Sequence, residues 1–415
     1  MVRHATLAFA LATATTIAAQ YSRPLSANIA SVQTVVGNRW LSLPIAELNG
    51  SEAVNISFDD LTHEYHRYCY RLEHCEADWT TSEQLFGSDY CNGFVRDILI
   101  DDMEESINTN ILYTHYSIQI PNQLCRPKIS GNYRLTIYDD DNGRDVAEAC
   151  FMLVQPLMSI SMEATTNTDI DIRGTHQQIG MTLDYGTQRV TNRERELTVV
   201  VMQNGRRDNA VINPRPQFIT PTSLKWQHNR ELIFLGGNEY RKFETLDVTH
   251  TTMGLEAVGW SDDDYHAYVW PDEPRPHYVY DEDANGYFYI RNSDNIDNDV
   301  ASEYLLVHFR LTTDRPHADI FLSGKWTAGQ LTEQYRMHYD EETQTYNSTQ
   351  VLKQGYYSYQ YLLLNSDGTV QTLPSEGNFY NTENQYQCLV YYRPIGQRTD
   401  QLVGYSQVQL QPNGR

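Results

Sequence analysis

Short alternations of apolar and polar residues recur along the whole chain. Val54-Asn-Ile-Ser-Phe58 alternates cleanly, and a period of two places Tyr68, Tyr70 and Leu72 on one face of a second segment. Leu197-Thr-Val-Val-Val-Met202 and Tyr304-Leu-Leu-Val-His-Phe-Arg-Leu311 are apolar runs of strand length, rich in β-branched or aromatic residues. The pattern therefore predicts strands almost throughout, with residues 101–110 as the best short helical candidate.

Turn signals separate these predicted strands. Asn204-Gly205 is typical of a type I′ turn, which needs two positive φ angles, and Gly236-Gly237 marks a second tight turn or close approach. Asp281-Glu-Asp-Ala-Asn-Gly286 and Asn365-Ser-Asp-Gly368 have the same character. Short strands with regular turn signals predict an all-β protein built of tandem immunoglobulin-like β-sandwich domains.

The length and two breaks in the pattern indicate the domain organisation. A chain of 415 residues exceeds one ordinary domain. Gln155-Pro156 is a plausible boundary, and the polar, acidic stretch 292–299 is a plausible linker. We expect an N-terminal β-sandwich over 20–156, a central β-sandwich over 157–300 and a C-terminal β-sandwich over 301–415.

The first nineteen residues have the order of a signal peptide. Arg3 and His4 precede an apolar stretch from Ala5 to Ile17, and small residues follow at Ala18-Ala19. No other segment approaches the length of a membrane span. Residues 1–19 are therefore predicted to direct export, leaving a soluble mature chain.

Charge and cysteine content narrow the classes of partner. Lys and Arg number 31 against 54 Asp and Glu, which gives a net charge of −23 and argues against nucleic acid or an anionic membrane surface. Export permits disulfides among the six cysteines. These are Cys69, Cys75, Cys91, Cys125, Cys150 and Cys388. Six cysteines allow fifteen pairings, and the sequence does not choose among them.

No catalytic or metal-binding motif stands out. The chain lacks a nucleophile elbow, a P-loop, an HExxH motif and a dinucleotide fingerprint. Asp281-x-Asp283-x-Asn285-Gly286 copies half of a calcium loop, but Asn292 stands where a bidentate Glu is needed, so a hairpin turn is the better interpretation. We expect no catalytic residue, cofactor or metal, although a hydrolase with two dispersed carboxylates stays open until geometry is known.

Aromatic residues in the last third could stack on sugars. The natural candidates are Trp326, Tyr356, Tyr357 and Tyr359. Alternation between core and surface in an aromatic-rich sandwich explains them better and is the favoured interpretation.

Two polar turns in the middle of the chain form the candidate structural or partner-contact motif. Its members flank the two glycine turns and are Asn204, Arg206, Arg207, Gly236, Gly237, Asn238, Glu239 and Arg241. No nucleophile, metal set or phosphate cradle accompanies them. We expect a paired polar corner that fixes two strands of the central domain, with partner contact as a secondary role, so Gly237→Val should harm folding first.

An ordered set of motifs resembles one family, the plug protein of the type IX secretion system of Bacteroidetes. The resemblance rests on the following blocks: Tyr68-x-Tyr-x-Leu-x6-Trp79, Tyr113-Thr-His-Tyr116, Ser130-Gly-Asn-Tyr133, Tyr138-Asp-Asp-Asp141, Gln203-Asn-Gly-Arg-Arg-Asp-Asn-Ala210, Gly236-Gly-Asn-Glu-Tyr-Arg241, Tyr265-His266, Asn285-Gly286, Lys353-Gln-Gly-Tyr-Tyr357, Thr382-Glu-Asn384 and Tyr391-Tyr-Arg393. Arg207 before Asp208 departs from the pattern, where an aromatic residue is expected. Gly355-Tyr-Tyr-Ser-Tyr-Gln-Tyr361 carries a separate likeness, by which the third unit, expected over 301–415, resembles E-set modules that often bind glycans; this implies an E-set-like β-sandwich for that unit.

The resemblance implies a function without catalysis. A protein of this family is expected in the periplasm, where it closes the periplasmic mouth of a large outer-membrane β-barrel translocon. The barrel is then the expected partner. We expect no contact with nucleic acid, no insertion into the membrane and a monomer when the protein is free. The alternative is an exported glycan-binding β-sandwich protein.

Overall fold

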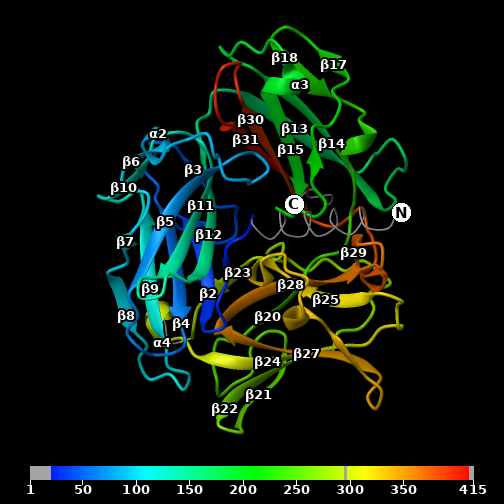
Figure 1. Ribbon diagram of the computed structural model, residues 1–415. Helices are drawn as coiled ribbons and strands as arrows, with labels where there is room; N and C mark the ends of the chain where they lie inside the picture. The colour runs from blue at the N-terminus through cyan, green and yellow to red at the C-terminus, as the bar shows by residue number, and fades with distance from the viewer. Residues whose placement is uncertain (1–19, 294–296, 411–415) are drawn as a thin grey trace, which may run out of the picture.

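The computed structural model describes residues 20–293 and 297–410, which form three β units around a common centre (Figure 1). The predicted signal peptide, residues 1–19, lies outside the described residues. The all-β prediction is confirmed, because strands account for nearly all regular structure and the helices span only three or four residues each. In the described part of the chain, no helix is both long and apolar enough to span a bilayer.

The first unit covers residues 20–155. Its strands are β1 (Arg23–Pro24), β2 (Ile29–Val36), β3 (Ile45–Glu47), β4 (Val54–Asp60), β5 (Tyr68–Cys75), β6 (Cys91–Gly93), β7 (Ile98–Leu99), β8 (Asp102–Glu105), β9 (Thr114–Ile120), β10 (Cys125–Pro127), β11 (Gly131–Asp139) and β12 (Asp145–Val154), with α2 (Gly87–Tyr90). The larger sheet has the order β1-β12-β11-β5-β7 with β3 beside β12, the second sheet has the order β2-β4-β9-β8, and β6 pairs with β10. Tyr68, Tyr70 and Leu72 point into the core between them, as their period of two predicts.

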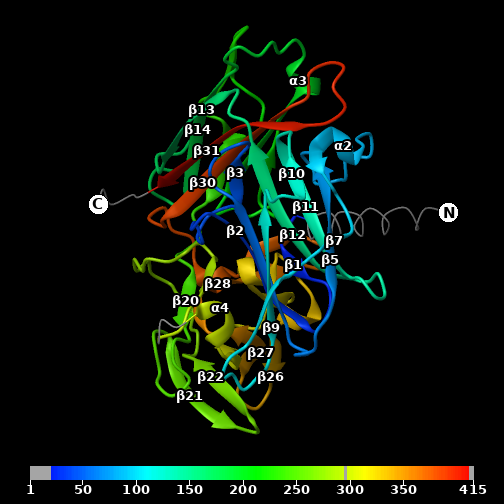
Figure 2. The ribbon, with the colours of Figure 1, turned by 90° about the vertical axis from the view of Figure 1, so that its left-hand side faces the viewer.

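The second unit joins two distant parts of the chain, residues 156–235 and 384–410. Its elements are β13 (Ser159–Thr165), β14 (His176–Asp184), α3 (Arg193–Glu196), β15 (Leu197–Gln203), β16 (Val211–Ile212), β17 (Phe218–Ile219), β18 (Ser223–Trp226), η1 (Arg230–Leu232), β19 (Ile233–Leu235), β30 (Asn384–Tyr392) and β31 (Gln401–Leu410). The sheet β16-β15-β30-β31 packs against the sheet built on β13, β14 and β18. Figure 2 shows β30 and β31 beside β13 and β14, apart from β28 below them.

The third unit, residues 241–373, is inserted between β19 and β30. Its elements are β20 (Arg241–Glu244), β21 (Leu255–Ser261), β22 (Asp264–Val269), β23 (Phe288–Ile290), α4 (Asn298–Ala301), β24 (Tyr304–Leu311), β25 (Asp319–Ser323), η2 (Lys325–Thr327), η3 (Glu333–Tyr335), β26 (His338–Asp340), β27 (Thr345–Lys353), β28 (Gly355–Leu364) and β29 (Val370–Thr372). One sheet has the order β21-β22-β24-β27-β26, and the other is built around β28. Their facing side chains form a third core.

The expected division after residue 300 differs from the structure. The third core takes residues from both sides of that position, and residues 384–410 pack in the second core rather than the third. The reason is the pairing of β15 with β30 from Leu197↔Tyr392 to Gln203↔Tyr386, which local pattern does not reveal. The first core ends at Leu153 and the second begins at Met158, so Gln155-Pro156 lies between them.

The helix expected over 101–110 is wrong. Residues 102–105 form β8, an edge strand that pairs with β9 from Asp102↔Ser117 to Glu105↔Thr114. All four side chains of β8 are exposed, so the strand has no buried face that a period of two in the sequence could reveal. Pairing with a neighbouring strand overrode local propensity.

Candidate functional site

Two chain segments run side by side from one unit to the other, between the second and third units. Residues 236–240 leave β19, and residues 374–383, which begin with η4 (Pro374–Glu376), return to β30. The Asn238 Nδ2 atom donates to the Glu376 carbonyl at 2.8 Å, and the Phe379 N–H donates to the Gly237 carbonyl at 2.8 Å. We call these two segments the double connection. The motif block around Gly236-Gly237 is therefore one half of it.

The two glycines of the double connection are required for different reasons. A Cβ on Gly236 would lie 2.1 Å from the Phe379 carbonyl oxygen, so only glycine permits this approach of two backbones. Gly237 has a φ of +64° but open space around it. Glycine is favoured at position 237 only because of this left-handed backbone conformation.

Charged side chains attach both segments of the double connection to the third unit. Arg241 donates to Asp272 at 2.7 Å and to Glu376 at 2.9 Å, and Glu376 is 1% exposed. Arg275 also pairs with Glu376. Glu239 accepts from the Tyr278 hydroxyl at 2.6 Å, and burial raises the pKa of Glu239 to about 6.

The other half of the predicted motif lies where all three units meet. Asn204 and Gly205 have φ angles of 55° and 61°, as the predicted type I′ turn requires. The Lys325 ammonium, from the third unit, donates to the carbonyls of Asn204 at 2.9 Å and Gly205 at 2.8 Å. From the first unit, the Tyr21 hydroxyl accepts from the Arg207 backbone N–H at 3.0 Å. We call this region, residues 203–210 with Tyr21 and Lys325, the junction loop.

The predicted single polar corner is divided into two parts. Arg206 pairs with its neighbour Asp208, whereas Arg241 pairs with Asp272 and Glu376 of the other cluster. Asn204 itself bonds to the neighbouring strand β30 of its own unit: its Nδ2 atom donates to Asn384 Oδ1 at 2.7 Å and its Oδ1 atom accepts from the Gln385 N–H at 2.8 Å. The motif thus joins units rather than only two strands of one sheet.

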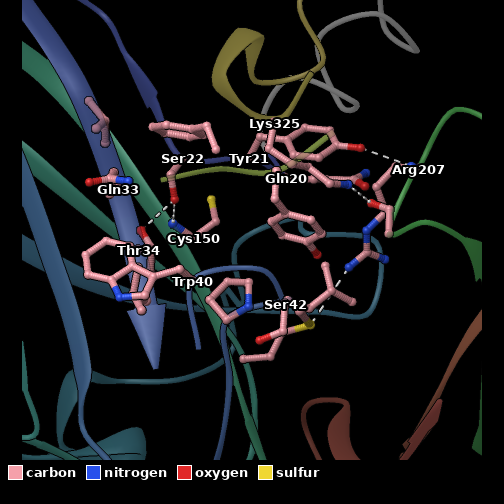
Figure 3. Close-up of a pocket in the computed structure, with 18 of the residues that line it drawn as sticks. Gln20, Tyr21, Ser22, Gln33, Thr34, Trp40, Ser42, Cys150, Arg207 and Lys325 are labelled. Atoms are coloured by element: carbon pink, nitrogen blue, oxygen red, sulfur yellow. Dashed lines mark hydrogen bonds between the residues drawn. The ribbon is translucent and has the colours of Figure 1, made fainter. Parts of the chain in front are cut away.

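A cavity of about 100 Å³ opens beside the junction loop (Figure 3). Figure 3 shows Tyr21, Lys325 and Arg207 around one space, with Trp40 and Ser42 on another side. These residues come from all three units, so the cavity exists only in the assembled fold.

Buried contacts also join the first unit to each of the others. Lys353 of the third unit donates to Asp59 of the first at 2.6 Å, with both side chains at most 2% exposed. The Tyr391 hydroxyl of the second unit donates to Asn132 Oδ1 of the first at 2.8 Å. Tyr391 also belongs to an apolar cluster shared by the first and second units. The cluster contains Ile45, Trp79, Cys150, Met152, Val200, Met202, Leu389, Tyr391 and Leu402.

Sequence reasoning missed several of these contact residues. Asp59, Tyr21 and Lys325 stand alone in the sequence, and the partners that they contact in other units lie more than a hundred positions away. Lys353 does begin one of the quoted motif blocks, Lys353-Gln-Gly-Tyr-Tyr357, which was the available signal. No local pattern relates that block to Asp59.

The other sequence candidates have structural roles. Tyr357 and Tyr359 are 1% exposed within the third core, and Trp326 packs against that core, which leaves no flat platform at these positions for a sugar. Asn285 and Gly286 have positive φ angles, and Asp283 accepts from the Asn285 N–H at 2.5 Å, so this segment is a turn. Among residues 20–293 and 297–410, no group of three or more His, Cys, Asp or Glu side chains is arranged to hold a metal ion.

Comparisons with known proteins agree with the motifs. Residues 29–155, the first unit, match the family model described as type 9 secretion system plug protein 1st domain. A crystal structure of a hypothetical protein from Parabacteroides merdae shares 37% identity with a TM-score of 0.91, covering 94% of this chain and 99% of that one. The C-terminal domain of the Streptococcus pyogenes protein AspA, at 6% identity over 92% of this chain and 98% of that one, has a TM-score of 0.17 and carries no argument. No curated protein matches the chain.

The first unit thus matches the first domain of type 9 secretion system plug proteins, and the fold of nearly the whole chain recurs in a solved protein. The chain belongs to the type 9 secretion system plug protein family.

Proposed function

We propose that this protein is a periplasmic plug, which closes the periplasmic opening of the large outer-membrane β-barrel translocon of the type IX secretion system. The match of the first unit to the plug family carries the proposal. The action is steric, and we assign no enzymatic step, cofactor or metal to it.

A steric plug needs a body that does not bend at its domain boundaries, and the contacts between the units support such a body. Each pair of units is joined by polar contacts: Lys353 with Asp59, Tyr391 with Asn132, and Lys325 with the carbonyls of Asn204 and Gly205. Units joined by one flexible linker would move relative to one another, whereas these units meet around a closed centre. The second and third units are also joined twice, through the double connection.

The proposed location follows from the family and from the charge. A net charge of −23 suits a protein that must remain soluble and bind its partner reversibly. We expect a polar interface of moderate size with the barrel, because an obligate apolar interface would not release. Export would be directed by residues 1–19.

Deletion of the gene tests the proposal. Loss of a plug should increase outer-membrane permeability to large hydrophilic solutes, and this increase should require an intact translocon barrel. Restoring the wild-type gene should reverse it. Unchanged permeability in the deletion strain would contradict the proposal.

Affinity purification separates the plug from the glycan-binding alternative. The tagged protein, recovered from cross-linked outer-membrane extract, should bring the translocon barrel with it. Retention on polysaccharide without a barrel partner would instead support the glycan-binding function.

A further inference from the structure

The cavity beside the junction loop combines half-buried positive charge with unused hydrogen-bond donors. Arg207 and Lys325 line it, and in the described part of the chain neither of them takes part in an ion pair. None of the described residues that line the cavity is an Asp or Glu, although the chain has 54 of them. Removing a cation from water without pairing it to an anion costs free energy, so the site favours a bound anion.

Two neutral side chains add to this preference. Trp79 is 3% exposed and Tyr287 is 7% exposed, and neither the Trp79 Nε1–H nor the Tyr287 hydroxyl has a hydrogen-bond partner in the described structure. Both residues line the same cavity. An indole N–H can only donate, so its missing partner must be an acceptor. Buried polar groups without partners are rare in folded proteins and call for an explanation.

The local geometry keeps these groups around one open space. A Cβ on Gly205 would lie 3.0 Å from the Lys325 Nζ atom and 3.3 Å from the Tyr287 hydroxyl oxygen, so glycine leaves the room between them. The Arg207 guanidinium lies over the Trp79 ring at 5.8 Å from its centroid, and the Lys325 Nζ atom lies 5.2 Å from that of Tyr287. The donors thus come from the first, second and third units.

We propose that this cavity is a binding site for a small oxyanion, such as a carboxylate or phosphate, which holds the three units together. The oxyanion accepts from the Trp79 N–H, the Tyr287 hydroxyl and the Arg207 guanidinium, and it faces the Lys325 ammonium. A volume of about 100 Å³ limits the ligand to one such group rather than a large metabolite.

The titration of Lys325 is consistent with this site. Burial and the neighbouring Arg206 and Arg207 lower the pKa of Lys325 to about 7, while Asp208 opposes that shift. A bound anion favours the charged ammonium, so binding should be accompanied by proton uptake near neutral pH and should weaken as the pH rises above 8.

Calorimetry on the full chain tests the site with sodium phosphate and sodium acetate as probes, and with sodium chloride at equal ionic strength as the reference. Saturable binding of phosphate or acetate is expected, and comparison of the two probes tells which oxyanion class is preferred. Tyr287→Phe removes one donor and retains the ring, and Trp79→Phe removes one donor and keeps a smaller aromatic ring, so each should weaken binding about tenfold or more. Arg207→Gln should abolish binding.

Arg39→Gln is the matched control, because Arg39 is exposed, pairs with Glu52 and does not line this cavity. It should leave binding unchanged. Absence of saturable binding, or effects of phosphate and acetate no larger than those of chloride, would mean that the cavity holds only water and would overturn the proposal. Binding that survives both Arg207→Gln and Tyr287→Phe would place the anion elsewhere and would also overturn it.

A different observation bears on the cysteines. The Cys91 and Cys125 sulfur atoms are 3.5 Å apart, on the paired strands β6 and β10. Both side chains are buried, and the hydrogen bond from Cys125 lowers the pKa of the Cys91 thiol below its usual value, which favours its thiolate. The sequence allowed fifteen pairings, and the structure brings these two sulfurs together.

We infer that Cys91 and Cys125 form a disulfide bond once the chain is exported, an inference that rests on the proposed periplasmic location. The Cys91 thiolate attacks a disulfide of a thiol oxidase or a small-molecule disulfide and expels one of its sulfurs as a thiolate. The Cys125 thiol then loses its proton and displaces the second sulfur. Two electrons and two protons pass to the donor, which is reduced to two thiols.

Mass spectrometry after alkylation under denaturing conditions tests this bond in two settings. The purified full chain treated with oxidised glutathione should yield one peptide pair linking Cys91 to Cys125, and Cys125→Ser should leave Cys91 open to alkylation. Cys388→Ser is the control and should retain the link. Failure to form the link in the purified chain would overturn the disulfide, whereas a link formed there but absent from cells would count against the periplasmic location.

Discussion

Lys353 and Asp59 are separated by 294 positions in the sequence, yet the Lys353 Nζ atom lies 2.6 Å from Asp59 Oδ2. The pair joins the third unit to the first and is completed by the Tyr304 hydroxyl, 2.6 Å from the same oxygen, and by His115 on the other oxygen at 2.6 Å. Burial opposes ionisation of Asp59, but Lys353 and His115 outweigh it and hold the pKa of Asp59 below its usual value.

Breaking this pair from one side should strongly destabilise the protein. Lys353→Met would leave the Asp59 carboxylate buried without its main counter-charge, which we expect to lower the free energy of unfolding by about 3–5 kcal/mol. Urea denaturation measures the change. The double variant Asp59→Asn with Lys353→Met should lose less than the sum of the two single changes, because each single variant leaves a group unpaired. A loss within about 1 kcal/mol for Lys353→Met would contradict this role.

The two glycines of the double connection should differ in their sensitivity to alanine. Gly236→Ala places a Cβ against the Phe379 carbonyl and should lower the free energy of unfolding by about 3 kcal/mol, since two backbones must separate. Gly237→Ala meets no neighbour and should lower it by only about 1–2 kcal/mol, from the left-handed φ. Thermal denaturation of both variants gives the comparison. Equal losses, or a larger loss at Gly237, would contradict the close approach at Gly236.

Arg241 should be poorly replaced by lysine, because it contacts Asp272 and Glu376 at once through different nitrogen atoms. Arg241→Lys should lower the free energy of unfolding by about 2 kcal/mol, because lysine offers a point charge in place of a planar fork. Hydrogen exchange should then increase in segments 236–240 and 374–383. Arg336→Lys is the control at an exposed arginine paired with Asp319, and it should change the stability by less than about 1 kcal/mol.

His74 should make the stability of the protein sensitive to acid. It is 1% exposed, its ring bonds to Ser82 and the Ser130 carbonyl, and burial lowers the pKa of His74 to about 4. Its folded pKa is below the unfolded value of about 6.5, so the unfolded state binds more protons between these values and stability falls as the pH drops from 6.5 to 4. The full contribution is about 3 kcal/mol.

The measurement is the free energy of unfolding against pH for the wild type and for His74→Asn. The variant should lose less stability than the wild type across that window, since it has no group there to protonate. His250→Asn, at an exposed histidine, should follow the wild-type curve. Parallel curves for wild type and His74→Asn would show that His74 does not carry this acid sensitivity.

Local sequence determined the strands, several turns and the family. The period of two in Tyr68-x-Tyr-x-Leu72 reflects a strand with one face in a core, and Asn204-Gly205 reflects a turn with two positive φ angles, because both features depend on neighbouring residues alone. The ordered motifs identified the plug family, and one of these motifs includes both Gly236 and Arg241.

Only the tertiary structure decided how the units are composed and what joins them. The pairing of β15 with β30 carries the C-terminal strands into the second unit, and no local pattern encodes a partner some 180 residues away. The same holds for Lys353 with Asp59 and for the donors around the junction cavity, which come from three units. Local propensity fixes which residues form strands, whereas the burial of distant charges and the packing of sheet faces decide which strands and units meet.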